Sequence, residues 1–182
     1  MTQLGWKAAF GSPEGRQRLG LERPLAAPLP DTGLLDSGAM VSLAGWTKPV
    51  LETEVAIWVG RGLGVAIELV DLTFPPDDVE RILASGIFHR HLVLGPPRAQ
   101  TLAGATATVT CDGEEVGATD DLTALTGEHD WVLAAVRDAA GRELREGEVV
   151  IAGAVVPPSP VEPGQRWQVD LGPLGRLAVA FA

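Results

Sequence analysis

Three glutamates are concentrated in two strand-like segments near the middle of the chain. Glu52 and Glu54 belong to the run 49–60, and Glu68 is centred in the apolar run 65–71 after a glycine-rich break. Successive side chains of a strand point to opposite faces, so Glu52 and Glu54 should project on the same side. Carboxylates among apolar, β-branched residues repel one another unless a proton or cation lies between them.

Pairing of the two segments would bring Glu68 to the same face. Three carboxylates favour a hard divalent cation, and we expect Mg²⁺ or Mn²⁺ held by Glu52, Glu54 and Glu68. The alternative is that these are exposed glutamates on an edge strand, and the pattern alone does not separate the two.

Composition narrows the class of protein. The 182 residues are enough for one domain with a sizeable core, and we expect a single domain over 1–182. A formal net charge of −10 without a Lys/Arg cluster argues against a nucleic-acid or anionic-membrane surface. One cysteine, Cys111, permits no internal disulfide, which fits a reducing compartment. Neither a leader nor a long apolar segment is evident, so a cytoplasmic location is expected.

The remaining segments predict a mainly β domain of α+β type. Short β-branched runs alternate with many of the 22 glycines and 14 prolines, and Asp112-Gly113 is typical of a hairpin turn. Residues 129–139 form the one convincing amphipathic helix, while short helices are expected after Ser12 and after Asp77 or Asp78. The proline-rich stretch 23–31 predicts a surface loop. The overall expectation is a mixed sheet with one main helix packed on it.

A few other polar residues could do chemistry. Lys7 lies in an apolar segment, where a lysine either extends to solvent or is held near an anion. His89 and His91 have the spacing of a chelating pair on a strand, but no third soft ligand is near, so a basic surface cluster is the preferred interpretation. Asp31 and Asp36 fall in a polar, glycine-containing region where solvated turn aspartates are common.

Several catalytic motifs are missing. The sequence contains no nucleophile elbow, P-loop, dinucleotide-binding fingerprint or paired CxxC, and the glycines of 60–64 precede a strand rather than a helix. Metal-assisted chemistry is therefore the leading hypothesis for an enzyme.

Four segments together resemble the fumarylacetoacetate hydrolase superfamily, in particular its 2-keto-4-pentenoate hydratase and 4-oxalocrotonate decarboxylase branch. They are residues 5–20, 49–54, 67–71 and 161–176, in the same order as in that family. The resemblance implies a mixed β-roll, like the C-terminal domain of fumarylacetoacetate hydrolase. It also implies one Mg²⁺ or Mn²⁺ on Glu52, Glu54 and Glu68, a 2-oxo acid substrate and a homo-oligomer.

The same resemblance assigns further roles. Lys7 matches the active-site lysine, which would hold the substrate carboxylate or move a proton. Asp36, or else Asp31, falls where the family places an acidic residue. The substrate-binding wall would be formed by Gly153, Ala154 and Val156.

The chain departs from the family in three places. It begins almost at the Gly-x-Lys motif, so we expect the usual N-terminal region to be absent. The family's Gly-Ser-x-Thr motif reads Gly153-Ala154-Val155-Val156 here, so both hydroxyls are missing. This argues against a hydration activity more than against decarboxylation. Leu72 follows Asp71 where an arginine is usual.

These observations favour a divalent-metal lyase that acts on a 2-oxo acid by hydration of a dienoate or by decarboxylation. An acylpyruvate C–C hydrolase would need a general base, for which His129 is a weak candidate. A non-catalytic ligand-binding or partner subunit of the same fold is the third possibility.

Overall fold

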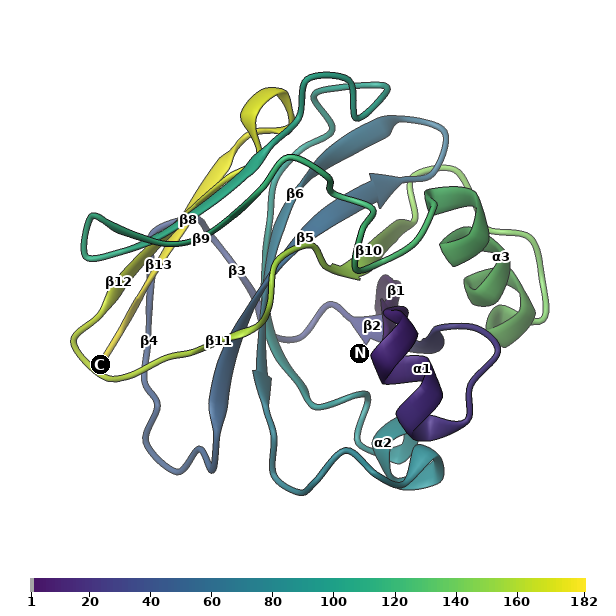
Figure 1. Cartoon of the computed structure of the whole chain (residues 1–182), viewed down its shortest axis with the longest axis horizontal. Coiled ribbons are helices and arrows are strands. Elements are labelled where there is room, and N and C mark those ends of the chain that lie inside the picture. The colour runs from purple at the N-terminus through teal and green to yellow at the C-terminus, as the bar shows by residue number, and fades with distance from the viewer. Residues whose placement is uncertain (1) are drawn as a thin grey trace.

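Two β-sheets packed against each other form the framework of the protein (Figure 1). The structure is a computed structural model and describes residues 2–182. The strands are β1 (Gln3–Ala9), β2 (Leu25–Pro30), β3 (Leu34–Leu35), β4 (Ala39–Val41), β5 (Pro49–Trp58), β6 (Gly62–Asp71), β7 (His89–Leu94), β8 (Ala107–Cys111), β9 (Glu114–Thr119), β10 (Val149–Ala154), β11 (Ser159–Pro160), β12 (Arg166–Asp170) and β13 (Arg176–Phe181). The helices are α1 (Pro13–Leu19), α2 (Val79–Ala84), α3 (His129–Ala140) and the 3₁₀ turn η1 (Gly172–Leu174).

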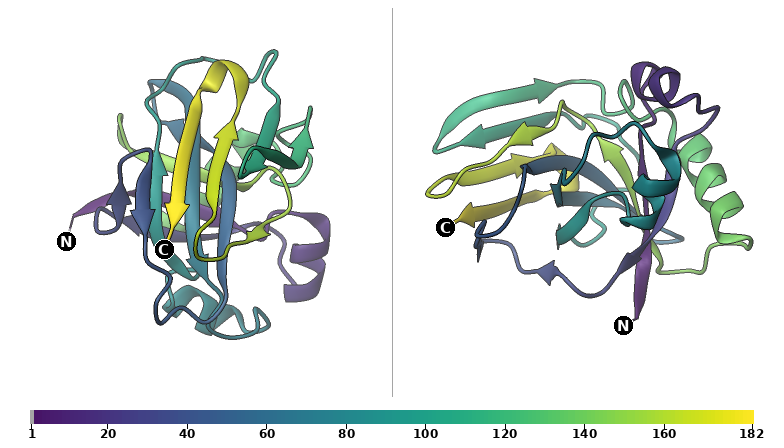
Figure 2. Two further views of the ribbon diagram at one scale, coloured as in Figure 1. Left: turned by 90° about the vertical axis from the view of Figure 1, so that its left-hand side faces the viewer. Right: turned by 90° about the horizontal axis from the view of Figure 1, so that it is seen from below.

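The larger sheet has eight strands and is mixed. Its order is β2-β1-β10-β5-β6-β7-β3, with β11 paired to β5. The β1–β10 and β3–β7 pairs are parallel and the others antiparallel. The sheet curls, as the views in Figure 2 show, so that its two faces have different surroundings.

The convex face of the larger sheet packs on the smaller sheet, which has the order β4-β13-β12-β8-β9. Strand alternation places Leu51, Val55, Ile67 and Leu69 of β5 and β6 in this inter-sheet core. The smaller sheet contributes the buried Trp167, Val169, Val179 and Phe181. This core is the main apolar interior of the molecule.

The helices cover the remaining faces. Val132 and Val136 of α3 join the inter-sheet core beside β1, β2 and β10. On the concave side, Ile82 of α2 is fully buried with Leu25 and Val50. Helix α2 therefore closes one end of the concave face.

The helix ends follow the sequence signals. The Ser12 side chain accepts a hydrogen bond from the Gly15 N–H, and Gly20 ends α1 in the left-handed conformation. Asp78 caps α2 in the same way, and Asp112-Gly113 forms the β8–β9 turn with positive φ at both residues.

The prediction of a surface loop over 23–31 is wrong, because residues 25–30 form β2. This strand lies at the edge of the larger sheet, and within residues 2–182 it pairs with β1 alone. A proline lacks a backbone N–H, which is tolerated on an edge strand where one side makes no ladder. Leu25, Ala27 and Leu29 alternate inward as in any half-buried strand.

The predicted fold class is otherwise confirmed: the chain is mainly β, with a mixed, curled sheet and α3 as its principal helix. No helix within residues 2–182 has the length and apolar character needed to cross a membrane.

Candidate metal centre

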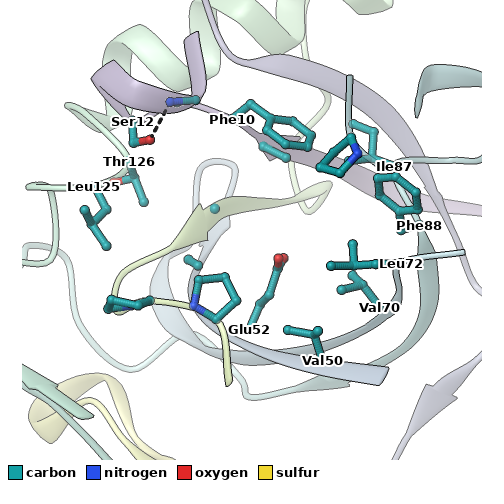
Figure 3. Close-up of a pocket in the computed structure, with 18 of the residues that line it drawn as sticks. Phe10, Ser12, Val50, Glu52, Val70, Leu72, Ile87, Phe88, Leu125 and Thr126 are labelled. Carbon is teal, nitrogen blue, oxygen red and sulfur yellow. Dashed lines mark hydrogen bonds between the residues drawn. The ribbon is translucent and has the colours of Figure 1, made fainter. Parts of the chain in front are cut away.

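The β5–β6 ladder brings the three glutamates together on the concave face. Glu52 pairs directly with Glu68, and Glu54 pairs with Ala66 in the antiparallel register. One carboxylate oxygen from each glutamate lies within 4.8 Å of the others. Glu54 and Glu68 are fully buried, whereas Glu52 is half-buried and directs its carboxylate into a cavity (Figure 3). They are thus not exposed glutamates on an edge strand.

Lys7 reaches the cluster from β1, across the curl of the sheet. Trp6 and Ala8 belong to the inter-sheet core, so Lys7 between them faces the concave side. Its ammonium lies 2.5 Å from Glu68 Oε1 and donates a second hydrogen bond to the Ile87 carbonyl at 2.9 Å. The side chain is 1% exposed, so Lys7 is held at a carboxylate rather than extended to solvent.

A β-bulge in β10 supports Glu54. Ile151 pairs with Ala56 and Ala154 with Glu54, so β10 has one more residue than β5 between these pairs. The bulge includes Gly153, whose φ of 99° suits glycine. Its N–H donates to Glu54 Oε2 at 2.8 Å, and this contact fixes one oxygen of the carboxylate.

A second bulge, in β7, supports Glu68. Leu69 pairs with His91 and Val70 with His89, which leaves Arg90 as the extra residue. In a regular strand His89 and His91 would share a face, but here they point to opposite sides of the sheet. His89 Nδ1 lies 2.7 Å from Glu68 Oε1, while His91 stacks on Trp46. The expectation of a basic surface cluster is wrong for His89, whose side chain is 7% exposed.

The bulged Arg90 has its own partner. Its guanidinium pairs with Asp71 at 3.2 Å, and Asp71 also accepts hydrogen bonds from the backbone N–H groups of Thr47 and Lys48. Asp71 therefore fixes the segment that leads into β5. The arginine that pairs with Asp71 therefore comes from β7. In the family that the sequence resembles, an arginine usually follows this aspartate directly in the chain.

The charges within the cluster influence one another strongly. Burial raises the pKa of Glu52 to about 7, an effect that Lys7 offsets and Glu68 reinforces. Burial, with the charges of Glu68 and Glu52, raises the pKa of Glu54 well above its usual value. Burial also opposes ionisation of Glu68, but Lys7 and His89 outweigh it and hold its pKa below the usual value. For Lys7, the three carboxylates outweigh burial and raise the pKa.

A cavity of about 720 Å³ opens above Glu52. Figure 3 shows Val70, Leu72 and Phe88 on one side of it and Leu125 and Thr126 on the other. The charged residues that line it besides Glu52 are exposed. They are Glu14, Arg18 and Lys48. The apolar wall comprises Phe10, Val50, Val70, Leu72, Ile87 and Phe88.

Some of the other predicted site residues line the cavity and others lie away from it. Gly153 and Ala154 line the cavity, but Val156 is buried in the inter-sheet core. Asp36 is exposed between β3 and β4 and is not among the residues that line the cavity or form the carboxylate cluster. Asp31 is also exposed and accepts a hydrogen bond from the Thr2 N–H.

The cluster has the charge and free oxygens that a divalent cation needs. Three ionised carboxylates and one ammonium sum to −2, which one divalent cation neutralises. Glu54 Oε1 and Glu68 Oε2 are buried and have no hydrogen-bond partner among residues 2–182. Buried carboxylate oxygens are costly without a proton, a hydrogen bond or a metal. The residues therefore fit a hard cation with oxygen ligands.

Solved structures share this fold. The chain aligns with 4-oxalocrotonate decarboxylase from Pseudomonas putida G7, complexed with magnesium and adipate, at a TM-score of 0.85 and 19% identity, over 100% of this chain and 78% of that one. Fumarylpyruvate hydrolase from Pseudomonas aeruginosa, in complex with Mn²⁺ and pyruvate, aligns at a TM-score of 0.71 and 18% identity, over 97% and 88%. For 2-hydroxyhepta-2,4-diene-1,7-dioate isomerase from Mycobacterium marinum the TM-score is 0.74 and the identity 13%, over 99% and 75%.

These neighbours are enzymes of the fumarylacetoacetate hydrolase superfamily, and the predicted fold of that type is confirmed. No protein-family profile matches the sequence.

Proposed function

We propose that this protein is a divalent-metal-dependent enzyme of the fumarylacetoacetate hydrolase superfamily that acts on a 2-oxo acid as a lyase. The observation that carries the proposal is the carboxylate cluster beneath the cavity, with Lys7 buried beside it. Mg²⁺ or Mn²⁺ would be held by Glu52, Glu54 and Glu68. Similar structures carry Mg²⁺ or Mn²⁺, and one of them is a complex with both Mn²⁺ and pyruvate.

The bound cation would supply a Lewis acid for the oxygens of a 2-oxo acid. Lys7 is a positioning residue in this arrangement, because it holds Glu68 and does not line the cavity. Arg18 and Lys48 outnumber Glu14 among the exposed charged residues of the cavity lining, and they supply positive charge that attracts an anionic substrate towards a protein of net charge −10.

The apolar wall favours decarboxylation over the other reactions. Hydration and C–C hydrolysis both need a group that orients or activates water. Ala154 lines the cavity without a hydroxyl, and Val156 lies in the inter-sheet core. The two hydroxyls at the lining are bonded to the backbone: Ser12 Oγ accepts from the Gly15 N–H, and Thr126 Oγ1 donates to the Leu122 and Gly127 carbonyls. His129, the candidate base for hydrolysis, is also absent from the cavity lining. A wall of this kind excludes water from a reacting carboxylate and so suits its loss as CO₂.

Calorimetry with Mg²⁺ and Mn²⁺ tests the metal site. The parent should bind one cation per chain at millimolar metal, and Glu52→Ala should lose most of the affinity because one of three ligands is gone. Glu115→Ala changes an exposed glutamate on β9 and serves as the matched control. Absence of binding by the parent at millimolar metal would refute the proposal.

A substrate panel tests the reaction. Oxaloacetate, a 2-hydroxy-2,4-dienoate and an acylpyruvate should be assayed side by side with the metal-loaded protein. Decarboxylation of the 2-oxo acid is the expected activity. Turnover of the acylpyruvate alone would instead assign a hydrolase, and metal binding without any turnover would assign a non-catalytic member of the fold.

A further inference from the structure

The strongest feature that the proposed function does not use is His89. This side chain is buried, its Nδ1 contacts Glu68, and its Nε2 has no hydrogen-bond partner within residues 2–182. Histidine is intermediate in how often it is buried, and a buried polar atom normally has a hydrogen-bond partner.

Two consecutive residues before His89 adopt an uncommon backbone. Ile87 and Phe88 have φ values of 53° and 63°, in the left-handed region that β-branched and bulky residues rarely occupy. Residues in this region are strained and persist where the surroundings hold them in place. The Ile87 carbonyl accepts the hydrogen bond from Lys7, and the bulge at Arg90 then places His89 on the concave face.

The two contacts converge on one oxygen of Glu68. Lys7 Nζ lies 2.5 Å and His89 Nδ1 2.7 Å from Oε1, whereas Oε2 has no partner within the described chain. A carboxylate held by two donors at one oxygen cannot rotate freely, so its second oxygen keeps a fixed direction. Partners of this kind orient metal ligands, and their loss typically weakens metal affinity by about 10–100-fold.

We propose that His89 is a positioning residue for the metal centre: with Lys7 it immobilises Glu68 Oε1 and so directs Oε2 to the cation. The inference rests on the proposed metal site and adds a residue from β7 to its support.

Three substitutions of His89 test the inference. Asn places its Nδ2 donor where His has Nδ1, Gln carries its amide one bond further, and Leu has neither donor nor acceptor. Calorimetry with Mg²⁺ should give His89→Asn an affinity within about threefold of the parent. His89→Gln and His89→Leu should bind about 10–100-fold more weakly. His91→Leu, on the opposite face of the same strand, is the control and should bind like the parent.

The outcomes separate this inference from the proposed function. If the parent binds Mg²⁺ and the Gln and Leu variants bind it equally well, His89 has no positioning role although the metal site stands. Equal losses in the Asn, Gln and Leu variants would also overturn the inference, because they would indicate a packing role. If His89→Leu fails to fold, as judged by circular dichroism, the Asn and Gln pair decides. Absence of binding by the parent overturns both proposals.

Discussion

The two faces of the β5–β6 ladder are built from alternate residues of the same two ten-residue strands, yet they differ in chemistry. The convex face presents Leu51, Val55, Ile67 and Leu69 to the inter-sheet core. The concave face carries Glu52, Glu54 and Glu68. Burial of the apolar residues stabilises the fold, whereas burial of like charges opposes it.

This difference separates stability from binding within one pair of strands. Burial of the apolar face contributes free energy of folding that offsets the cost of burying like charges on the concave face. This is usual where a site is preorganised. A substitution on one face should therefore change the free energy of unfolding, and one on the other face should change mainly metal affinity. Substitution of Lys7 should change both the free energy of unfolding and the metal affinity, because its side chain is buried and its charge acts on the carboxylates.

The largest effect on stability is expected for Lys7→Met. The substitution removes the one ammonium bonded to Glu68 and leaves the carboxylate cluster without its compensating charge. Breaking a buried ion pair costs about 3–5 kcal/mol. Urea denaturation of the metal-free protein at pH 8 measures this loss. Lys48→Met changes an exposed lysine and should stay within about 0.5 kcal/mol of the parent. Equal stability of the two variants would contradict the importance of the pair.

Ile67→Ala changes the apolar face alone and should lower the free energy of unfolding. Ile67 is fully buried in the inter-sheet core and points away from the glutamates beside it. Truncation of such a side chain costs about 2–5 kcal/mol, and Ile67→Val about 0.5–1.5 kcal/mol. The Mg²⁺ dissociation constant of the folded variant should remain within about threefold of that of the parent. Calorimetry at a temperature well below the unfolding midpoint of the variant measures it. A large loss of metal affinity would show that the two faces are not independent.

The sequence predicts this two-faced ladder because the alternation is local. Residue types within the runs 49–60 and 65–71 define both faces without knowledge of any partner, and the turn at Asp112-Gly113 and the cap at Ser12 are equally local signals. The resemblance to a known family then favours the metal role of the glutamates over exposed glutamates on an edge strand, and it assigns Lys7 to the site.

The features that the sequence does not predict depend on distant partners. The strand β2 forms despite its prolines because an edge position is available beside β1. His89 joins the centre through a bulge that only the pairing of β6 with β7 defines. Asp36 and Val156 are implied as site residues only by the family resemblance, and the structure places neither at the cavity. No local pattern could have corrected these assignments.

Glu54→Gln should separate function from stability most clearly. The amide keeps an acceptor for the Gly153 N–H and removes one of the charges that repel each other. The metal-free variant should gain about 0.5–2 kcal/mol, as substitutions that relieve a functional site commonly do. Its Mg²⁺ affinity should fall by more than about 10–100-fold, because a ligand is lost rather than an outer partner. Denaturation and calorimetry measure the two changes, and lower stability of the metal-free variant would contradict the assumed repulsion.

The pH dependence of stability in the metal-free protein tests the electrostatic cost of one carboxylate on the concave face. The pKa of Glu52 is raised from 4.5 to about 7, so the folded state binds its proton more tightly than the unfolded state does. The stability contribution of this group is complete below pH 4.5 and is lost as the pH rises to about 7. His91 and His129 act in the opposite direction, since burial lowers the pKa of each. Both histidines are present in Glu52→Gln and in the parent. Their contribution therefore cancels in the difference in melting temperature between the two proteins.

With EDTA, Glu52→Gln should therefore become progressively more stable than the parent as the pH rises from 4.5 to 7. Saturating Mg²⁺ should abolish this trend, because a cation that binds the ionised carboxylate stabilises the parent and not the variant. A difference that does not change with pH would mean that Glu52 ionises in the folded protein as it does in the unfolded chain. The concave face would then carry no electrostatic cost at this position, and the contrast between the two faces would rest on Glu54 and Glu68 alone.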